Sequence, residues 1–255
     1  MQTKRISIYL ILLLSLFSGL EANAQLDGLL KKAKDKAGEI IDKKVDAGSG
    51  SKSSDKFIAG DTLIFAEDFS GTKNSAQNGS FKSNGLVAVE NVTGNSGKWM
   101  ALQDKATYKF SKVIIYPKQF TVEFDILATG EQVKDIAPMS FGFATDNSTR
   151  EYTSNVGAYT ELHYYDGNQV NFGNSSPKRH VNTTFDLAGY LNRPLRVALF
   201  VDGQKMAVYL DGQKIQDGIF FNPSAAKNFY ITAPWMYENG AKVLVRNIKV
   251  YGFKK

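Results

Sequence analysis

The sequence predicts an all-β domain folded as a two-sheet antiparallel sandwich, and three observations support this prediction. Two Asp-Gly pairs, Asp202-Gly203 and Asp211-Gly212, separate runs of β-branched and aromatic residues between positions 195 and 215. Asp-Gly between alternating apolar runs is a strong hairpin signal, because both central residues of a type I′ turn need a positive φ. Similar short runs follow one another from position 57 onward, separated by Gly, Asn, Asp and Ser. No helical period reappears among them, which favours a sandwich or jelly roll.

The first 24 residues have the pattern of a secretory signal peptide. Lys4 and Arg5 precede an apolar run over 6–17, and Ala22-Asn23-Ala24 fits the small-x-small rule for cleavage. The run is short for a membrane span, so we expect cleavage rather than an uncleaved anchor. Export to the periplasm, the outer membrane or the extracellular space would follow. The sequence contains no cysteine, so we expect the core alone to stabilise the domain, without disulfides.

Residues 25–46 differ from the rest of the chain. Apolar residues recur there at steps of three and four, with lysines and acidic residues between them, which predicts one amphipathic helix. The Gly, Ser and Lys residues of 47–56 predict a flexible linker. The helix could pack on the domain, contact a partner protein or touch a membrane peripherally through 26–46. Its apolar stripe is rich in Ala and has no Trp or Phe, which favours protein over lipid.

The β domain is predicted over 57–255. Each predicted strand is a short run of apolar, β-branched or aromatic residues between turn residues. In chain order these runs are 62–69, 86–90, 98–103, 107–116, 120–127, 139–145, 158–165, 170–172, 195–201, 206–210, 228–232 and 243–251. Much of the excess behind the formal net charge of +6 is spread singly along the strands, and no cluster of Lys and Arg is interleaved with aromatics. We therefore expect no nucleic-acid partner.

Four segments, in this order, resemble concanavalin A-like (laminin-G-like) jelly rolls. They are Leu63-Ile-Phe-Ala-Glu-Asp-Phe-Ser70, Phe120-Thr-Val-Glu-Phe-Asp-Ile126, the hairpins at 195–215 and Asn247-Ile-Lys-Val-Tyr251. The resemblance covers 61–252. The order of helix, linker and β domain also resembles the N-terminal region of some secreted proteins of the outer-membrane protein A family. Those proteins usually add a C-terminal peptidoglycan-binding domain, which we do not expect because this sequence ends at Lys255.

The resemblance raises the question of glycoside hydrolysis. Laminarinase-type relatives carry Glu-x-Asp-x-x-Glu on one strand, where the first Glu is the nucleophile and the last is the general acid. Here Glu123 and Asp125 have the right spacing, but Ala128 occupies the position of the final Glu. Half of a retaining pair does not hydrolyse a glycoside, so we expect no enzymatic activity.

The resemblance also implies a possible calcium ion near the terminal strands, held by an Asp before Asn-Ile-x-Val-Tyr. Arg246 occupies that position and would repel the ion, although Glu67 and Asp68 could still serve as ligands. We therefore expect no cofactor. The sequence has two histidines and no cysteine, which disfavours zinc, haem and thiol chemistry.

Aromatic, amide and charged side chains remain as candidates for a ligand site. In the 158–165 run, strand alternation predicts that Tyr159, Glu161, His163 and Tyr165 share one face. The full candidate set is Tyr159, Glu161, His163, Tyr165, Asn171, Arg179, Trp235 and Tyr237. Such groups could stack on sugar rings and bind hydroxyls, although strands and turns are also rich in Tyr and Asn.

The sequence thus favours a secreted, non-catalytic binding module for an envelope or extracellular glycan. The alternatives are an envelope interaction protein that assembles through its helix and, third, a hydrolase-like enzyme.

Overall fold

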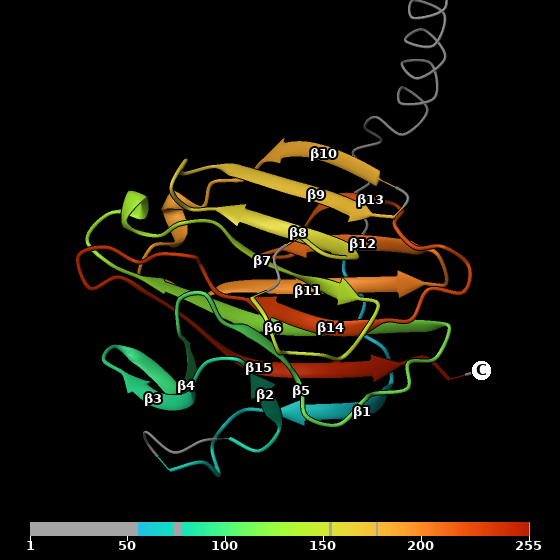
Figure 1. The fold of residues 1–255 in the computed structure, drawn as a ribbon, viewed down its shortest axis with the longest axis horizontal. Coiled ribbons are helices and arrows are strands. Elements are labelled where there is room, and N and C mark those ends of the chain that lie inside the picture. Colours follow the sequence, from blue (N-terminus) through green and yellow to red (C-terminus); the bar gives the residue numbers. More distant parts are fainter. Residues whose placement is uncertain (1–55, 74–77, 153–154, 177, 255) are drawn as a thin grey trace, which may run out of the picture. The chain divides into compact units, whose positions relative to one another are not determined.

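A computed structural model describes residues 56–73, 78–152, 155–176 and 178–254. These residues all belong to one compact unit that spans Ser54–Lys255. The predicted signal peptide (1–24), the predicted helix (25–46) and almost all of the predicted linker lie outside the described residues. The unit is an all-β sandwich of two antiparallel sheets, as the sequence predicts (Figure 1).

Sheet A is built around the long central strands β6 and β15, which pair along most of their length. Its strand order is β13 (Gln213–Ile219), β12 (Lys205–Leu210), β11 (Leu195–Asp202), β6 (Gln119–Thr129), β15 (Lys242–Gly252), β4 (Asn95–Leu102) and β3 (Val87–Val92). The first strand, β1 (Thr62–Glu67), also pairs with β15. The β11–β12–β13 meander is the double hairpin that the two Asp-Gly turns predict, and Asp211, Gly203 and Gly212 have positive φ.

Sheet B carries the candidate site. Its strand order is β10 (Lys178–Thr184), β9 (Gln169–Ser175), β8 (Ala158–His163), β7 (Met139–Ala144), β14 (Asn228–Thr232), β5 (Thr107–Phe110) and β2 (Phe81–Ser83). Two single 3₁₀ turns, η2 (Val133–Asp135) and η3 (Ala188–Tyr190), interrupt the connecting loops. Strands β8, β9 and β10 follow one another along the chain and in the sheet, so they form an edge meander.

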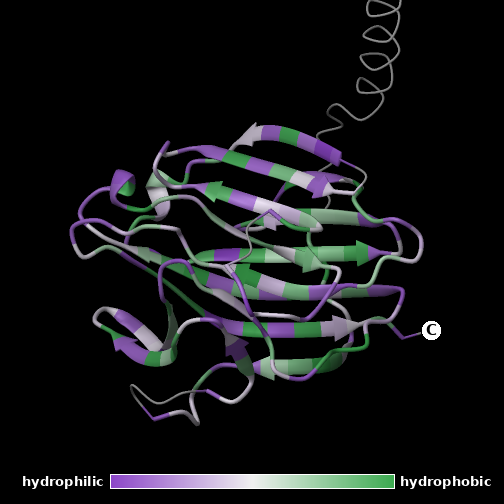
Figure 2. Cartoon of the chain, viewed as in Figure 1, coloured by the Kyte–Doolittle hydropathy of each residue, from purple (hydrophilic) through white to green (hydrophobic). Residues whose placement is uncertain are grey.

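The core lies between the sheets and is rich in phenylalanine. Strand β6 turns Phe120, Val122, Phe124 and Ile126 inward, and all four are buried. Phe124 meets Phe141 of sheet B edge to face, with ring centroids 5.2 Å apart. Each fully buried side chain of this size stabilises the fold by about 1.5–3 kcal/mol. Figure 2 shows the resulting alternation of hydrophobic and hydrophilic residues along the strands.

Several strand predictions need correction: β2 was not predicted, β1 ends at Glu67 rather than at position 69, and three further differences affect the core and the site. The predicted run 107–116 ends as strand β5 at Phe110, and Ile114 and Tyr116 instead pack on the core from a loop. Strand β8 ends at His163, two residues before the predicted end. Strand β10 was not predicted, because Lys178–Thr184 contains mostly polar residues. As an edge strand it needs few apolar side chains, so hydrophobicity did not reveal it.

Candidate functional site

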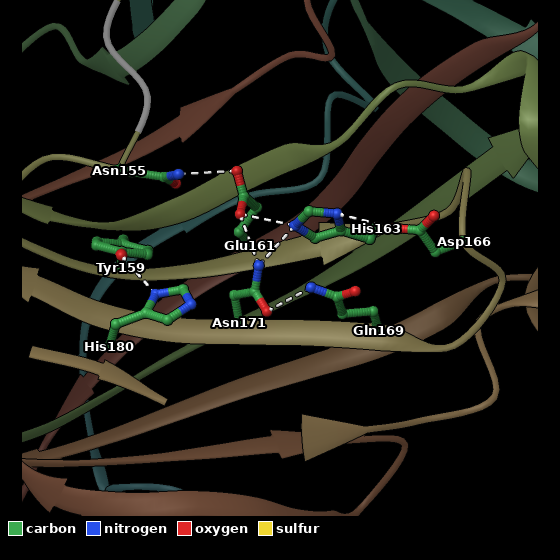
Figure 3. A network of polar contacts seen from close by, with 8 residues as sticks. All are labelled: Asn155, Tyr159, Glu161, His163, Asp166, Gln169, Asn171 and His180. Carbon is green, nitrogen blue, oxygen red and sulfur yellow. Dashed lines mark hydrogen bonds and ion pairs between the residues drawn. The ribbon is translucent and has the colours of Figure 1, made fainter. Parts of the chain in front are cut away.

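The site lies on the face of sheet B that points away from the core. Residues that pair across strands share a face, so the register places Glu161, Asn171 and Asn182 in one row across β8, β9 and β10. A neighbouring row contains Tyr159, Gly173 and His180. The alternate residues of β8, Thr160 and Leu162, point inward and are fully buried. Figure 3 shows the network of polar side chains that gathers on this face of the edge meander.

Tyr159 reaches across β9 because Gly173 has no side chain. A Cβ built on Gly173 would lie 2.3 Å from the Tyr159 hydroxyl oxygen. The phenol passes over this gap, and its hydroxyl lies 3.3 Å from Nδ1 of His180 on β10. The ring also packs beside Tyr230 and Ala144 in a small apolar cluster on this outer face. These contacts fix the position of Tyr159.

Glu161 is the centre of the polar network. Its Oε1 accepts a hydrogen bond of 2.8 Å from the Asn155 amide, and its Oε2 accepts one of 3.1 Å from the Asn171 amide. His163 Nε2 lies 2.7 Å from the same Oε2. The Glu161 side chain is 16% exposed, so the carboxylate is held from three sides while one region stays open to solvent. Gln169 extends the network by donating a 3.0 Å hydrogen bond to Oδ1 of Asn171.

His163 lies between two carboxylates. Its Nδ1 is 3.3 Å from Oδ2 of Asp166, on the opposite side of the ring from Glu161. The turn after β8 brings Asp166 into place, since the Asp166 amide donates to the His163 carbonyl and Gly167 takes a positive φ. The imidazole is 17% exposed and therefore fills the space between the two acids.

The hydrogen bonds to Glu161 outweigh its burial. Burial raises the pKa of this carboxyl group, but the Asn155, His163 and Asn171 contacts bring it to a net value below the ordinary one. Burial, together with the negative charge of Glu161, raises the pKa of Tyr159. The carboxylate is consequently an acceptor at neutral pH, while the phenol keeps its proton and can donate.

The structure brings four of the eight predicted site residues together: Tyr159, Glu161, His163 and Asn171. Tyr165 follows the end of β8 and lies exposed in the turn, so it does not continue the row that strand alternation predicts. Strand β8 ends earlier than predicted because Gly167 and Asn168 close the hairpin.

The other three predicted residues lie apart from this network. Arg179 belongs to the opposite face of β10, where it donates to the Ile219 carbonyl and stacks on the Phe220 ring. Tyr237 is a core residue whose hydroxyl donates to the Leu102 carbonyl. Trp235 is half exposed in the loop after β14, at the same end of sheet B as His163.

Sequence reasoning missed Asn155, Gln169 and His180. Asn155 lies in a loop, and its partner Glu161 is evident only from the fold. His180 belongs to the unpredicted strand β10. Exposed and half-exposed residues alternate along 178–184, as in a strand with one solvated face, but this alternation is evident only in the structure.

The incomplete glucanase motif lies on the other sheet. Glu123 and Asp125 point to the outer face of sheet A, where Glu123 is 2.5 Å from Arg196. Asp125 is 3.4 Å from Arg246 and accepts a 2.6 Å hydrogen bond from Asn247. Ala128 is buried in the core, with 0% exposure. These two carboxylates are thus engaged in ion pairs, and they lie on a different sheet from the β8–β10 meander.

The possible calcium ligands are also engaged. Glu67 accepts hydrogen bonds from the Phe69 amide, the Ser80 hydroxyl and the Asn78 amide. Asp68 accepts one from the Ser70 amide, which lowers the pKa of its carboxyl group. Within the described ranges, no three His, Cys, Asp or Glu side chains gather in a metal-binding cluster. In the same part of the chain, no helix is both long and apolar enough to cross a membrane.

Comparison with solved structures shows the class of this fold. The exoplasmic/lumenal domain of VIP36 superposes with a TM-score of 0.52 at 10% identity, covering 76% of this chain and 92% of that one. Arcelin-5, a lectin-like defense protein from Phaseolus vulgaris, gives a TM-score of 0.50 at 13% identity, covering 69% and 94%. A sialidase gives 0.52 at 18% identity, covering 78% of this chain. The chain therefore has the fold of these structures, a two-sheet jelly-roll sandwich.

The match to longer proteins is partial. This chain spans 19% of the sialidase and 48% of the binding domain of botulinum neurotoxin serotype D, which it matches with a TM-score of 0.51. No protein-family model matches the sequence. No curated protein matches it either. At these identities the likeness defines the fold alone.

Proposed function

We propose that the protein is a non-catalytic glycan-binding module and that the outer face of β8–β10 is its binding site. The observation that carries this proposal is the network around Glu161, which places amide, carboxylate, imidazole and phenol groups together on one face of the sheet, with the Glu161 and His163 side chains partly exposed. These groups supply both donors and acceptors, as the hydroxyl groups of a sugar require. The network is pre-organised by its internal hydrogen bonds, so little ordering would accompany binding. Lectin-like proteins and a toxin binding domain among the structural neighbours support the same class of function.

The network itself argues against hydrolysis. Two catalytic carboxyl groups of a glycosidase flank the scissile bond, and the sugar occupies the space between them. Here the His163 ring occupies the space between Glu161 and Asp166. On sheet A, Arg196 and Arg246 hold Glu123 and Asp125 in ion pairs. Binding without turnover is therefore the function that these residues favour.

The proposal extends to the compartment. The signal-like pattern of 1–24 supports export, which would place the module in the periplasm, at the outer membrane or outside the cell. The candidate partner is then a carbohydrate or a protein of the cell envelope. The likeness of the helix, linker and β-domain order to outer-membrane protein A family proteins supports an envelope role. Finding the cellular protein with Gln25 at its N-terminus would test export directly.

Binding is tested by a glycan array with the purified chain, followed by calorimetric titration of the sugars that bind. We expect Asn171→Ala to weaken binding about tenfold or more, because the variant loses an amide that donates to Glu161 and leaves that carboxylate less well held. Glu123→Gln, on the outer face of sheet A, serves as the matched control and should bind like the native chain. An array without hits, or equal binding by Asn171→Ala, would contradict the proposal.

A further inference from the structure

A second concave surface adjoins the network and was not indicated by the sequence. A groove of about 670 Å³ lies where β10 leads into η3. We call it the η3 groove, and its lining includes Asn168, Thr184, Phe185, Asp186, Tyr190 and Arg193. It is formed by the β8–β9 turn, the end of β10 and the loop that enters β11.

The strand register relates the groove to the network through Gln169. In the sheet register Gln169 pairs with His163 on one side and with Thr184 on the other. Paired residues share a face, so His163, Gln169 and Thr184 form one row on the outer face. Gln169 also donates to Asn171 of the network. The distance from His163 to Thr184 is two strand spacings, roughly 10 Å.

The walls of the groove are fixed by hydrogen bonds and ring contacts. The Phe185 amide donates to the Asn168 carbonyl, which ties the end of β10 to the β8–β9 turn. The Phe185 and Tyr190 rings stack with centroids 5.4 Å apart. The Tyr190 hydroxyl donates a 2.5 Å hydrogen bond to Asp211. These contacts fix the shape of the groove before any ligand binds.

The groove offers charged groups of both signs. The guanidinium of Arg193 lies over the Tyr190 ring, 4.3 Å from its centroid. Among the described residues Arg193 forms no ion pair with a carboxylate. Asp186 accepts from the Gly189 amide through one oxygen, and Thr184 is exposed beside it. One cation, one anion, a hydroxyl and an amide together suit a neutral polyhydroxylated ligand.

We propose that the η3 groove is a second subsite for the glycan, so that the protein binds an oligosaccharide chain rather than a single terminal sugar. This inference rests on the proposed function of the network around Glu161. One sugar unit would lie over Glu161 and Asn171, the chain would pass Gln169, and a later unit would occupy the groove beside Arg193. Neutral chains are favoured because one guanidinium, of Arg193, and one carboxylate, of Asp186, both line the groove.

The test uses neutral glucose and N-acetylglucosamine oligomers of one to six units, titrated into the native chain and three variants. Arg193→Ala removes the guanidinium, and Thr184→Val is a second groove variant with little change in volume. Lys178→Ala, at the opposite end of β10, is the matched control. We expect native affinity to rise with length, and the two groove variants to bind the hexamer about three- to tenfold more weakly while binding the shortest ligand unchanged.

The outcomes separate the two proposals. Native affinity that is independent of length, or groove variants that bind the hexamer as well as native, would overturn the second subsite and leave the first intact. Equal loss at every length in Arg193→Ala would overturn it too, because the residue would then act on the whole site. If the native chain binds none of these oligomers, both the subsite and the proposed function are contradicted for neutral glycans.

Discussion

The Tyr159 phenol crosses strand β9 at Gly173, where a Cβ would lie only 2.3 Å from its hydroxyl oxygen. The same Cβ would lie 2.6 Å from the Arg179 carbonyl oxygen, which belongs to the backbone and cannot rotate away. Glycine at this position therefore lets a large aromatic ring lie flat across the sheet and reach His180. Tyr159 can contact His180 across β9 because Gly173, the residue between them, has no side chain.

Gly173→Ala should accordingly displace Tyr159 and destabilise the domain by about 1–3 kcal/mol, as overpacking of a filled site does. Chemical denaturation would measure the change in the free energy of unfolding. Gly79→Ala is the matched control, because nothing lies within 4 Å of the Cβ that would be added there. If both variants unfolded at the same denaturant concentration, the close approach at Gly173 would have no energetic weight.

Glu161 should make the stability of the domain depend on acid pH. Its folded-state pKa lies below the ordinary value because the hydrogen bonds to its ionised form outweigh burial. A carboxyl group of this kind adds stability that is present above its unfolded pKa of about 4.3. That stability is lost as pH falls through the unfolded and then the lower folded pKa.

We therefore expect Glu161→Gln to lose less unfolding free energy than the native chain between pH 5 and pH 3. Urea denaturation at several pH values would give both curves. Glu131→Gln, at an exposed loop position, should keep the native pH dependence. A Glu161→Gln curve parallel to the native one would mean that the network does not favour the ionised carboxylate.

The sequence predicted the sandwich and half of the candidate site, because both follow from patterns within single strands and turns. Strand alternation placed Tyr159, Glu161 and His163 on one face, because a strand of ordinary geometry has a period of two. Alternation could not locate the end of β8, so Tyr165 was included although it lies in the turn. The hairpin turn, rather than the pattern of the strand, decides that boundary.

The rest of the site could not be predicted, because its residues lie far apart in the sequence or belong to a strand of mostly polar residues. Strand β10 buries none of its residues and therefore carried no hydrophobic signal, so His180 was missed. Arg179, one residue earlier, was predicted as a site residue. Side chains alternate between the two faces of a strand, so Arg179 lies on the face opposite to His180. The η3 groove combines a turn, a strand end and a loop, and no single stretch of sequence reveals it.

The two arginines of sheet A should differ in their contribution to stability. Arg246 is 20% exposed, is 3.4 Å from Asp125 and lies over the Trp99 ring at 4.6 Å. It also donates to the Ser96 carbonyl. Arg196 is 60% exposed and has Glu123 as its ion-pair partner. Among the described residues, the exposed guanidinium of Arg196 thus has one partner, whose own side chain is 10% exposed, whereas the more buried guanidinium of Arg246 has three partners and should contribute more.

Arg246→Ala should therefore lower the free energy of unfolding by about 1–3 kcal/mol, because it leaves Asp125 without its cation and removes the contact with Trp99. Arg196→Ala, the matched variant, should cost less than about 1 kcal/mol. Thermal and urea denaturation of both variants would rank them. A larger loss for Arg196→Ala would show that the Glu123 pair, rather than the Asp125 cluster, stabilises this face.

Calcium should add little to the stability of the domain. The residue before the terminal Asn247 is Arg246, whose positive charge would repel a divalent cation. The oxygens of Glu67 already accept three hydrogen bonds, and Asp68 caps the turn at Ser70. Binding calcium there would require breaking these bonds.

We expect the melting temperature of the purified chain to stay the same when EDTA replaces millimolar calcium. A fall of more than about 5 °C, equivalent to about 1–2 kcal/mol for a domain of this size, would instead reveal a bound ion.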